Sequence, residues 1–182
     1  GTTTGRRRRV GWFDCVPLRH AVAVNSVSSI MLNKLDILSG IDRLLMALLE
    51  LTPSEDTSEE TYGFVRSFGT DVLGKTCVRS GDQAGFIVNR LLIPYLFDAI
   101  RLYESGFATR EDIDTAMRLG LAHPMGPLTL SDLIGLDTLL AIGEVLREAY
   151  PAEPRFDAPK LLRDLVAEGK LGKKSGGGFY DA

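Results

Sequence analysis

The apolar residues of this chain follow a helical pattern most clearly between Asp82 and Gly106. There they recur at steps of three and four, which predicts a helix with one buried face. Two polar residues, Asn89 and Arg90, interrupt the pattern in its first turn. The apolar positions are Val88, Leu92, Tyr95, Leu96, Ala99 and Tyr103, and the face is widened by Ile87, Leu91 and Ile100.

The first turn of this helix is a candidate for ligand binding. A helix N-terminus presents free amide hydrogens and a partial positive charge. An asparagine at that place offers a donor and an acceptor to a ligand that carries a carbonyl group. The alternative is structural: Asn89 caps or braces the helix start, and Arg90 makes a salt bridge to a loop.

Three shorter elements are predicted before this stretch. The run 45–51 fits a strand or a helix by its pattern alone. The sequence 57–60 combines hydroxyl side chains with two acids, which predicts a helix start. That helix is expected to run to about Leu73 with Gly74 as its C-cap, and residues 75–79 to form a strand.

After Gly106, residues that start and end helices recur at regular intervals and predict a series of helices. The fold class is therefore expected to be mainly α, with a small β element before Asp82. A rigid turn at 123–127 is expected to separate the first two. Phe179 and Tyr180 are expected to anchor a glycine-rich tail to the core. The predicted helices are 109–120, 129–134, 136–150 and 159–168, and in the first of them Ile113, Ala116, Met117 and Leu119 are expected to face inward.

The first forty residues differ in character from the rest. A Gly/Thr loop leads into Arg6–Arg9, a short strand is predicted at 29–32, and Asn33–Asp36 read NKLD. Such a loop suits an anion, and NKxD has the form of a guanine-recognition motif. The alternative is a solvated basic arm and a chance match. The 29–32 strand is expected to have no partner sheet.

Composition narrows the class of protein. The chain has 182 residues, 45% of them hydrophobic, and a formal net charge of -3, which suits one globular domain or one domain with an appendage. This balance gives no reason to expect a nucleic-acid partner. Cys15 and Cys77 form no CxxC pair, which favours a reducing compartment and no structural metal. No apolar run predicts a membrane span or a secretory signal, so a cytoplasmic protein is expected.

Three stretches together carry a family resemblance: GFIVNRLLIPYLFDAIRLYESG, EDIDTAMRLGLAHPMGPLTLSDLIGLDT and GKKSGGGFYDA. From about residue 46 to 182 the chain resembles the C-terminal half of NAD-dependent 3-hydroxyacyl-CoA dehydrogenases, including the 3-hydroxybutyryl-CoA type. The resemblance implies a strand at 45–51, the end of a Rossmann domain at 44–81 and a helical domain at 82–182. In the family such helical domains form homodimers and one wall of the acyl-CoA cleft.

The resemblance assigns one catalytic and substrate-binding residue, Asn89, which would help to position the oxygen of the acyl-CoA substrate beside a catalytic histidine. It implies that this histidine and the glutamate that holds it lie outside the sequence, as does the NAD site. No GxGxxG follows a strand, and Gly176–Gly178 read as tail glycines, so no cofactor-binding residue is assigned. His123 is expected to be structural, and His20 belongs to the unrelated first segment.

Residues 1–43 resemble an internal piece of adenylosuccinate synthetase. The resemblance would place Thr2, Thr3, Arg6 and Arg8 in an aspartate-binding loop, and Lys34 and Asp36 in a GTP site. The family's phosphate loop and catalytic Asp and His have no counterpart here, so synthetase activity is not expected. The two parts join near residues 42–46, through a natural fusion, a rearranged gene or deliberate joining.

Three functional hypotheses follow. The first is the C-terminal part of a dehydrogenase that oxidises L-3-hydroxyacyl-CoA with NAD and is inactive alone. The second is a non-catalytic helical module for dimerisation or acyl-CoA binding. The third is a remnant of a GTP-dependent ligase.

Overall fold

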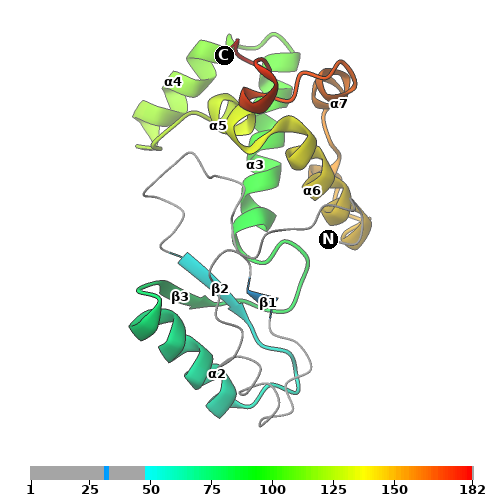
Figure 1. Cartoon of the computed structure of the whole chain (residues 1–182). Helices are drawn as coiled ribbons and strands as arrows, with labels where there is room; N and C mark the ends of the chain where they lie inside the picture. The colour runs from blue at the N-terminus through cyan, green and yellow to red at the C-terminus, as the bar shows by residue number, and fades with distance from the viewer. Residues whose placement is uncertain (1–30, 33–47, 182) are drawn as a thin grey trace.

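The computed structural model describes residues 31–32 and 48–181 of the chain. Figure 1 shows a small sheet with one helix at one end and a group of helices at the other. The mainly α fold class is therefore confirmed, as is the small β element before Asp82. The elements are β1 (Met31–Leu32), β2 (Leu48–Thr52), α2 (Glu59–Ser67), η2 (Phe68–Val72), β3 (Thr76–Arg79), α3 (Val88–Glu104), α4 (Arg110–Gly120), α5 (Pro127–Ile134), α6 (Leu136–Ala149), η3 (Pro154–Phe156), α7 (Lys160–Ala167) and η4 (Lys173–Ser175).

The sheet has the strand order β1-β2-β3. β2 and β3 are parallel and are connected through α2, so the strand–helix–strand prediction is confirmed. β1 pairs with β2 in the antiparallel sense, with Met31 opposite Thr52 and Leu32 opposite Leu51. The expectation that this strand has no partner sheet was wrong, because a pairing across different parts of the chain leaves no local signal. Residues 29–30 lie outside the described residues.

Helix α2 begins as the hydroxyl pattern predicts. The Ser58 side chain accepts a hydrogen bond from the Thr61 amide at 3.1 Å, and Glu59 and Glu60 occupy the first turn. The helix then widens into the π-helical turn η2, which the sequence did not predict. Gly74, with a φ of 62°, follows that turn in the left-handed region that favours glycine.

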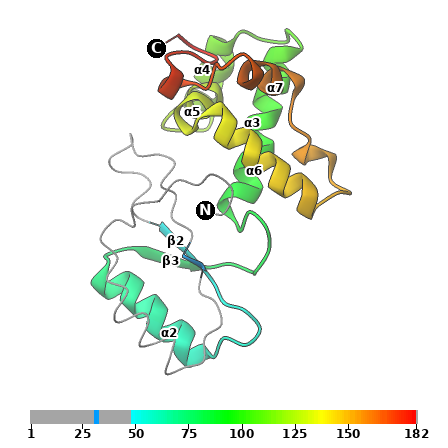
Figure 2. The ribbon, with the colours of Figure 1, turned by 45° about the vertical axis from the view of Figure 1, so that its right-hand side comes forward.

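Helix α3 forms the centre of the helical part, as Figures 1 and 2 show. Leu96, Phe97 and Ile100 on this helix have no exposed surface. The buried face is narrower than predicted, because Leu91 is 65% exposed and Ile87 is also exposed. Fully buried side chains of the other helices that join this core are Leu128, Leu136, Leu139, Phe156 and Leu162.

Helix α4 starts and ends as predicted, but fewer of its apolar side chains are buried than predicted. Thr109 is its N-cap and accepts a hydrogen bond from the Asp112 amide at 3.1 Å. Ile113 is buried and Met117 is half-buried, whereas Ala116 and Leu119 are exposed. The prediction that the side chains of Ala116 and Leu119 face the core was therefore wrong for the single chain.

Two buried aspartates tie the tail and α5 to the core. Asp114 accepts hydrogen bonds from the amides of Leu128 (2.8 Å) and Thr129 (2.9 Å) and from the Tyr180 hydroxyl (3.1 Å). Asp132 accepts from the amides of Phe179 (2.9 Å) and Tyr180 (2.8 Å). Burial raises the pKa of the Asp132 carboxyl, although these two amide bonds oppose the shift. The predicted anchoring by Phe179 and Tyr180 agrees with these contacts.

We predict that Gly143→Ala destabilises the helical part. A Cβ atom at Gly143 would lie 2.4 Å from Cζ of Phe97, where α6 approaches α3. The overpacking should lower the free energy of unfolding by about 1–3 kcal/mol. The matched control is Gly120→Ala, since a Cβ there would meet nothing within 4 Å. Thermal denaturation followed by circular dichroism measures both, and equal melting temperatures would contradict the close packing.

Candidate functional site

The chain enters α3 through a sharply bent segment. Gly85 and Phe86 both have positive φ values, 81° and 46°, and the latter conformation is uncommon for a residue other than glycine. The Phe86 amide donates to the Gln83 carbonyl at 3.1 Å. Asn89 is the second residue of the helix and is half-buried. The structure thus places Asn89 in the first turn of α3.

A buried carboxylate from the sheet meets this helix start. Glu50, on β2, is 3% exposed, and its Oε1 accepts hydrogen bonds from the amides of Ile87 (2.9 Å) and Val88 (3.2 Å). These amides would otherwise have no partner inside the helix, and the negative charge suits the positive end of the helix dipole. Both contacts from described residues reach Oε1 and none reaches Oε2.

Sequence reasoning assigned no role to Glu50. Its signal is a single acid inside the apolar run of β2, LLELT. An acid is almost never fully buried without a partner, so this position was informative. Its partners lie 37 and 38 residues away, however, and nothing in the local pattern names them.

The side chain of Asn89 makes no hydrogen bond with any other residue in the described part of the chain. The N-cap position belongs to Ile87, whose side chain cannot cap a helix. The carboxylate of Glu50 takes over the capping of the two amides that precede Asn89. The amide group of Asn89 is therefore free of the structural bonds described for its neighbours.

Arg90 makes the predicted contact to a loop. Its Nη2 lies 3.7 Å from Oε1 of Glu153, and its guanidinium stacks over the Tyr150 ring at 4.3 Å. The Tyr150 hydroxyl donates to the Ala84 carbonyl at 3.1 Å. These contacts fasten the segment before α3 to the end of α6, which fits a structural role for Arg90.

His123 also has structural contacts. Its Nδ1 lies 3.1 Å from the Tyr95 hydroxyl, and the two rings pack edge to face with centroids 5.6 Å apart. Ala122, just before it, has a φ of 54°. Burial, with the charge of Asp114 as a smaller cause, raises the pKa of Tyr95. The contacts place His123 in the packing between α3 and the turn after α4.

The end of β2 does not fit a dinucleotide. In parallel sheets a phosphate is bound where a glycine-rich turn leads from a strand into a helix. The turn from β2 to α2 instead carries Glu55 and Asp56, followed by Glu59 and Glu60 in the helix. Glu59 is paired with Arg79, and the negative charges of the other three acids would repel a pyrophosphate.

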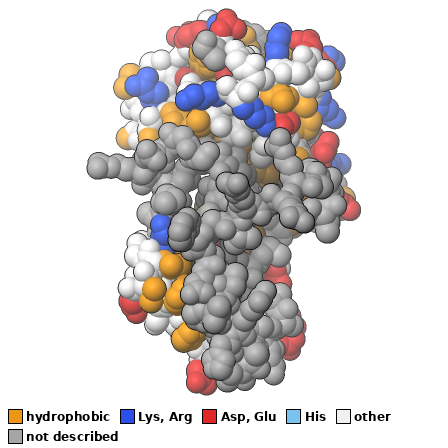
Figure 3. Space-filling view, in the orientation of Figure 1, with side chains coloured by type: hydrophobic (Ala, Val, Ile, Leu, Met, Phe, Trp, Pro, Cys, Tyr) orange, Lys and Arg blue, Asp and Glu red, His pale blue; other side chains and the backbone are white. Residues whose placement is uncertain are grey.

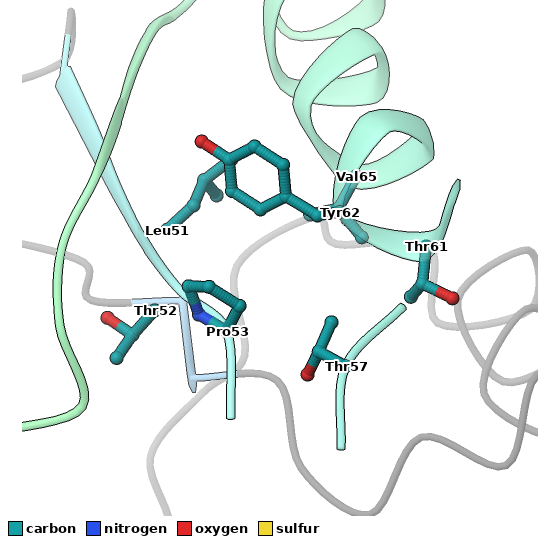
Figure 4. A pocket seen from close by; sticks show the side chains of 7 residues that line it. All are labelled: Leu51, Thr52, Pro53, Thr57, Thr61, Tyr62 and Val65. Carbon is teal, nitrogen blue, oxygen red and sulfur yellow. The ribbon is translucent and has the colours of Figure 1, made fainter. Parts of the chain in front are cut away.

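The cavity at this place is also too small for such a ligand. Figure 4 shows residues of β2 and α2 around it, with the Thr52 hydroxyl turned away from α2. Its volume of about 20 Å³ suffices for one water. The lining residues are Leu51, Thr52, Pro53, Thr57, Thr61, Tyr62 and Val65.

A larger groove of about 450 Å³ lies between α6, η3 and α7 and contains none of the predicted site residues. Thr2, Thr3, Arg6, Arg8, Lys34 and Asp36 lie outside the described residues, as does His20. In residues 31–32 and 48–181, no group of three or more His, Cys, Asp or Glu side chains is arranged to hold a metal. None of the helices described combines the length and apolar character needed to cross a membrane.

The comparisons with known proteins agree with this helical architecture. A profile of the 3-hydroxyacyl-CoA dehydrogenase C-terminal domain matches residues 85–182, and one of adenylosuccinate synthetase matches residues 1–50. A probable 3-hydroxyacyl-CoA dehydrogenase of Caenorhabditis elegans is 55% identical over 136 residues, which are 75% of this chain and 45% of that protein. The human mitochondrial hydroxyacyl-coenzyme A dehydrogenase is 48% identical over 136 residues, covering 75% of this chain and 43% of its own length.

Solved structures give the same result. FadB2 of Mycobacterium tuberculosis superposes with a TM-score of 0.73 at 50% identity, covering 76% of this chain and 48% of that one. The (S)-3-hydroxybutyryl-CoA dehydrogenase of Ralstonia eutropha gives 0.71 at 42% identity, covering 75% of this chain and 48% of that one. The helical part is thus of the dehydrogenase class.

More particularly, the chain belongs to the 3-hydroxyacyl-CoA dehydrogenase family, through its C-terminal domain. It spans about half the length of the curated relatives that it matches. The first segment is similar to adenylosuccinate synthetase over a shorter stretch.

We predict that Glu50→Ala destabilises the junction of β2 and α3 much more than Glu50→Gln. Alanine leaves the partly buried amides of Ile87 and Val88 without this acceptor, at a cost of about 1–3 kcal/mol. Glutamine retains an oxygen that can take the place of Oε1. Hydrogen exchange at those two amides measures the difference, and equal protection in both variants would show that the carboxylate is not the cap.

Proposed function

We propose that this chain is the C-terminal part of an NAD-dependent L-3-hydroxyacyl-CoA dehydrogenase and provides the wall against which an acyl-CoA is positioned. The observation that carries the proposal is the place of Asn89 at the start of α3: its side-chain amide makes no hydrogen bond with a described residue, and it follows directly after Ile87 and Val88, whose backbone amides bind the buried carboxylate of Glu50. Family membership gives the reaction: oxidation of the 3-hydroxyl group to a 3-oxo group.

Asn89 supplies a neutral donor to the substrate oxygen. The side-chain NH₂ group donates to either the hydroxyl of the substrate or the carbonyl of the product. The positive end of the α3 dipole also favours the partial negative charge on that oxygen. Together these groups orient the reacting carbon of an acyl-CoA whose chain lies along the helical domain.

Glu50 is the residue of this chain best suited to hold the catalytic histidine. The family's base is a histidine oriented by a glutamate, and the sequence analysis placed both outside this chain. Glu50 is buried, it binds the backbone amides of the two residues before Asn89, and its Oε2 receives no contact from described residues. We therefore assign the glutamate of the pair to Glu50, so that only the histidine comes from elsewhere.

NAD binding would come from a part of the enzyme outside the described residues. When bound, NAD accepts the hydride from the carbon that carries the hydroxyl group. The division into 1–43, 44–81 and 82–182 assigns the first segment to the synthetase-like piece, the second to the end of the NAD-binding domain and the third to the helical domain. On this proposal the chain alone turns over no substrate, and its compartment is the cytoplasm.

We predict that the chain binds acetoacetyl-CoA through Asn89 but does not bind NADH. Calorimetric titration with each ligand separately tests this, and Asn89→Ala should weaken acetoacetyl-CoA binding about tenfold through the loss of one hydrogen bond. Asn89→Asp is a matched variant of the same size that lacks the donor. Thr115→Ala, at an exposed position of α4, serves as the control.

The results separate the candidate functions. Acetoacetyl-CoA binding that is lost in both Asn89 variants supports the substrate wall. Binding that is unchanged in both contradicts the role of Asn89. No binding of either ligand favours a non-catalytic helical module, whereas an NADH-dependent rate above background would overturn the assignment of NAD binding to another part of the enzyme.

We also propose that the helical part forms a homodimer through the outer side of α3 and α4. Tyr95 contacts His123, so the middle of α3 lies beside the turn that follows α4. Large apolar side chains are exposed along both helices and the loop between them: Leu91, Leu102, Phe107, Leu119 and Leu121. Figure 3 shows apolar side chains among charged ones on one face of the helical part. A second copy would cover this exposed apolar surface.

We predict that Leu119→Lys and Phe107→Lys shift the chain from dimer to monomer. Both side chains are 78% exposed, so the change costs little in the single chain but places a charge in a buried interface. The control is Val145→Lys on α6, which is 59% exposed. Analytical ultracentrifugation over a concentration series measures the oligomeric state of the parent chain and of each variant. A monomeric parent chain, or a dimer that survives both changes, would contradict this interface.

A further inference from the structure

The strand β1 lies in the segment that is similar to adenylosuccinate synthetase, but it pairs with Leu51 and Thr52 of β2, which follow that segment. Three consecutive residues of β2 are buried: Glu50 and Leu51 at 3% exposed and Thr52 at 8%. A strand that is buried on both faces is typical of the interior of a sheet. β2 has this environment although β3 occupies only one of its edges.

The direction of the backbone groups in β2 follows from one hydrogen bond. The Leu51 carbonyl accepts from the Ser80 amide at 2.9 Å, so the main-chain groups of Leu51 face β3. Because these groups alternate along a strand, those of Thr52 face the opposite edge. Thr52 lies directly opposite Met31 in the antiparallel register. Met31 and Thr52 are therefore the hydrogen-bonded pair, while the main-chain groups of Leu32 point away from β2.

We propose that residues 31–32 serve as the edge strand that completes the sheet of β2 and β3, and that this is what the synthetase-like segment does in this chain. The occupant of the β2 edge is thus a segment of the chain's own first part. This assignment is independent of any acyl-CoA chemistry. It gives the segment a structural function that needs neither a GTP site nor an aspartate loop.

The physical need for such a strand is clear from the size of the sheet. Two parallel strands and one covering helix leave a row of unpaired main-chain groups along β2. A two-stranded unit is marginally stable at best, and a third strand supplies the missing partners. Glu50 lies on β2, so the strand that fixes β2 also fixes the carboxylate that caps α3.

The first experiment uses proline to separate the two edges of β1 in the full chain. Met31→Pro removes the N–H that faces Thr52 and places the ring against β2. Leu32→Pro is the matched control, because proline is tolerated on an edge strand where its N–H would face outward. Met31→Ala controls for the side chain alone. Hydrogen exchange of the Thr52 amide is read by NMR, with the Leu51 amide as an internal reference.

We expect Met31→Pro to speed exchange at Thr52 about tenfold or more, with exchange at Leu51 changed less than about twofold. Leu32→Pro and Met31→Ala should leave exchange at Thr52 within about threefold of the parent. Fast exchange at Thr52 in the parent chain would overturn the proposal, as would equal effects of the two prolines. A helical circular dichroism signal that matches the parent shows that the variants remain folded.

A cross-link tests the register without weakening the strand. Residues opposite each other in a hydrogen-bonded antiparallel pair have Cα atoms about 5.5 Å apart, within the range that a disulfide spans. In a background with Cys15→Ser and Cys77→Ser, Met31→Cys combined with Thr52→Cys should form a disulfide on mild oxidation. Met31→Cys combined with Thr57→Cys should not. Absence of the first cross-link, or equal yields from both pairs, would contradict the register.

Discussion

The amides at the start of α3 need an acceptor, and the arrangement of the whole chain depends on how Glu50 supplies it. The carboxylate comes from β2 and binds the amides of Ile87 and Val88, so the sheet and the helices meet at one buried charge. An uncompensated carboxylate at this depth would be costly, and the helix dipole together with two donors offsets that cost. Asn89 owes its placement to this contact, because it follows the two capped residues directly.

Much of this fold could be predicted from local signals. The hydroxyl of Ser58, that of Thr109, and the spacing of apolar residues in α3 set helix starts and lengths through contacts within a few residues. The place of Asn89 in the first turn of α3 was predicted in the same way. Glu50 and the pairing of β1 were not, because their partners lie far along the chain and no local pattern points to them.

The exposed leucines show a second limit. Leu91 and Leu119 fit the helical period and were expected to face inward, yet both lie on the surface of the single chain. The helical spacing of apolar residues indicates which side chains prefer an apolar environment. It does not indicate whether the same chain or another chain provides that environment. The sequence alone therefore could not separate the core of the domain from an apolar face on its surface.

The two aspartates that bind the tail also bear on the order in which the domain is made. Asp114 and Asp132 accept hydrogen bonds from Phe179 and Tyr180, which follow every helix described here. During synthesis, the residues of α3 to α7 are made before these donors exist, so the Asp132 carboxylate must stay solvated until then, whereas Asp114 can already bind the amides of Leu128 and Thr129. The last step in building this helical domain is consequently the arrival of its tail, and a ribosome that stalls shortly before residue 179 would hold a domain with an open core.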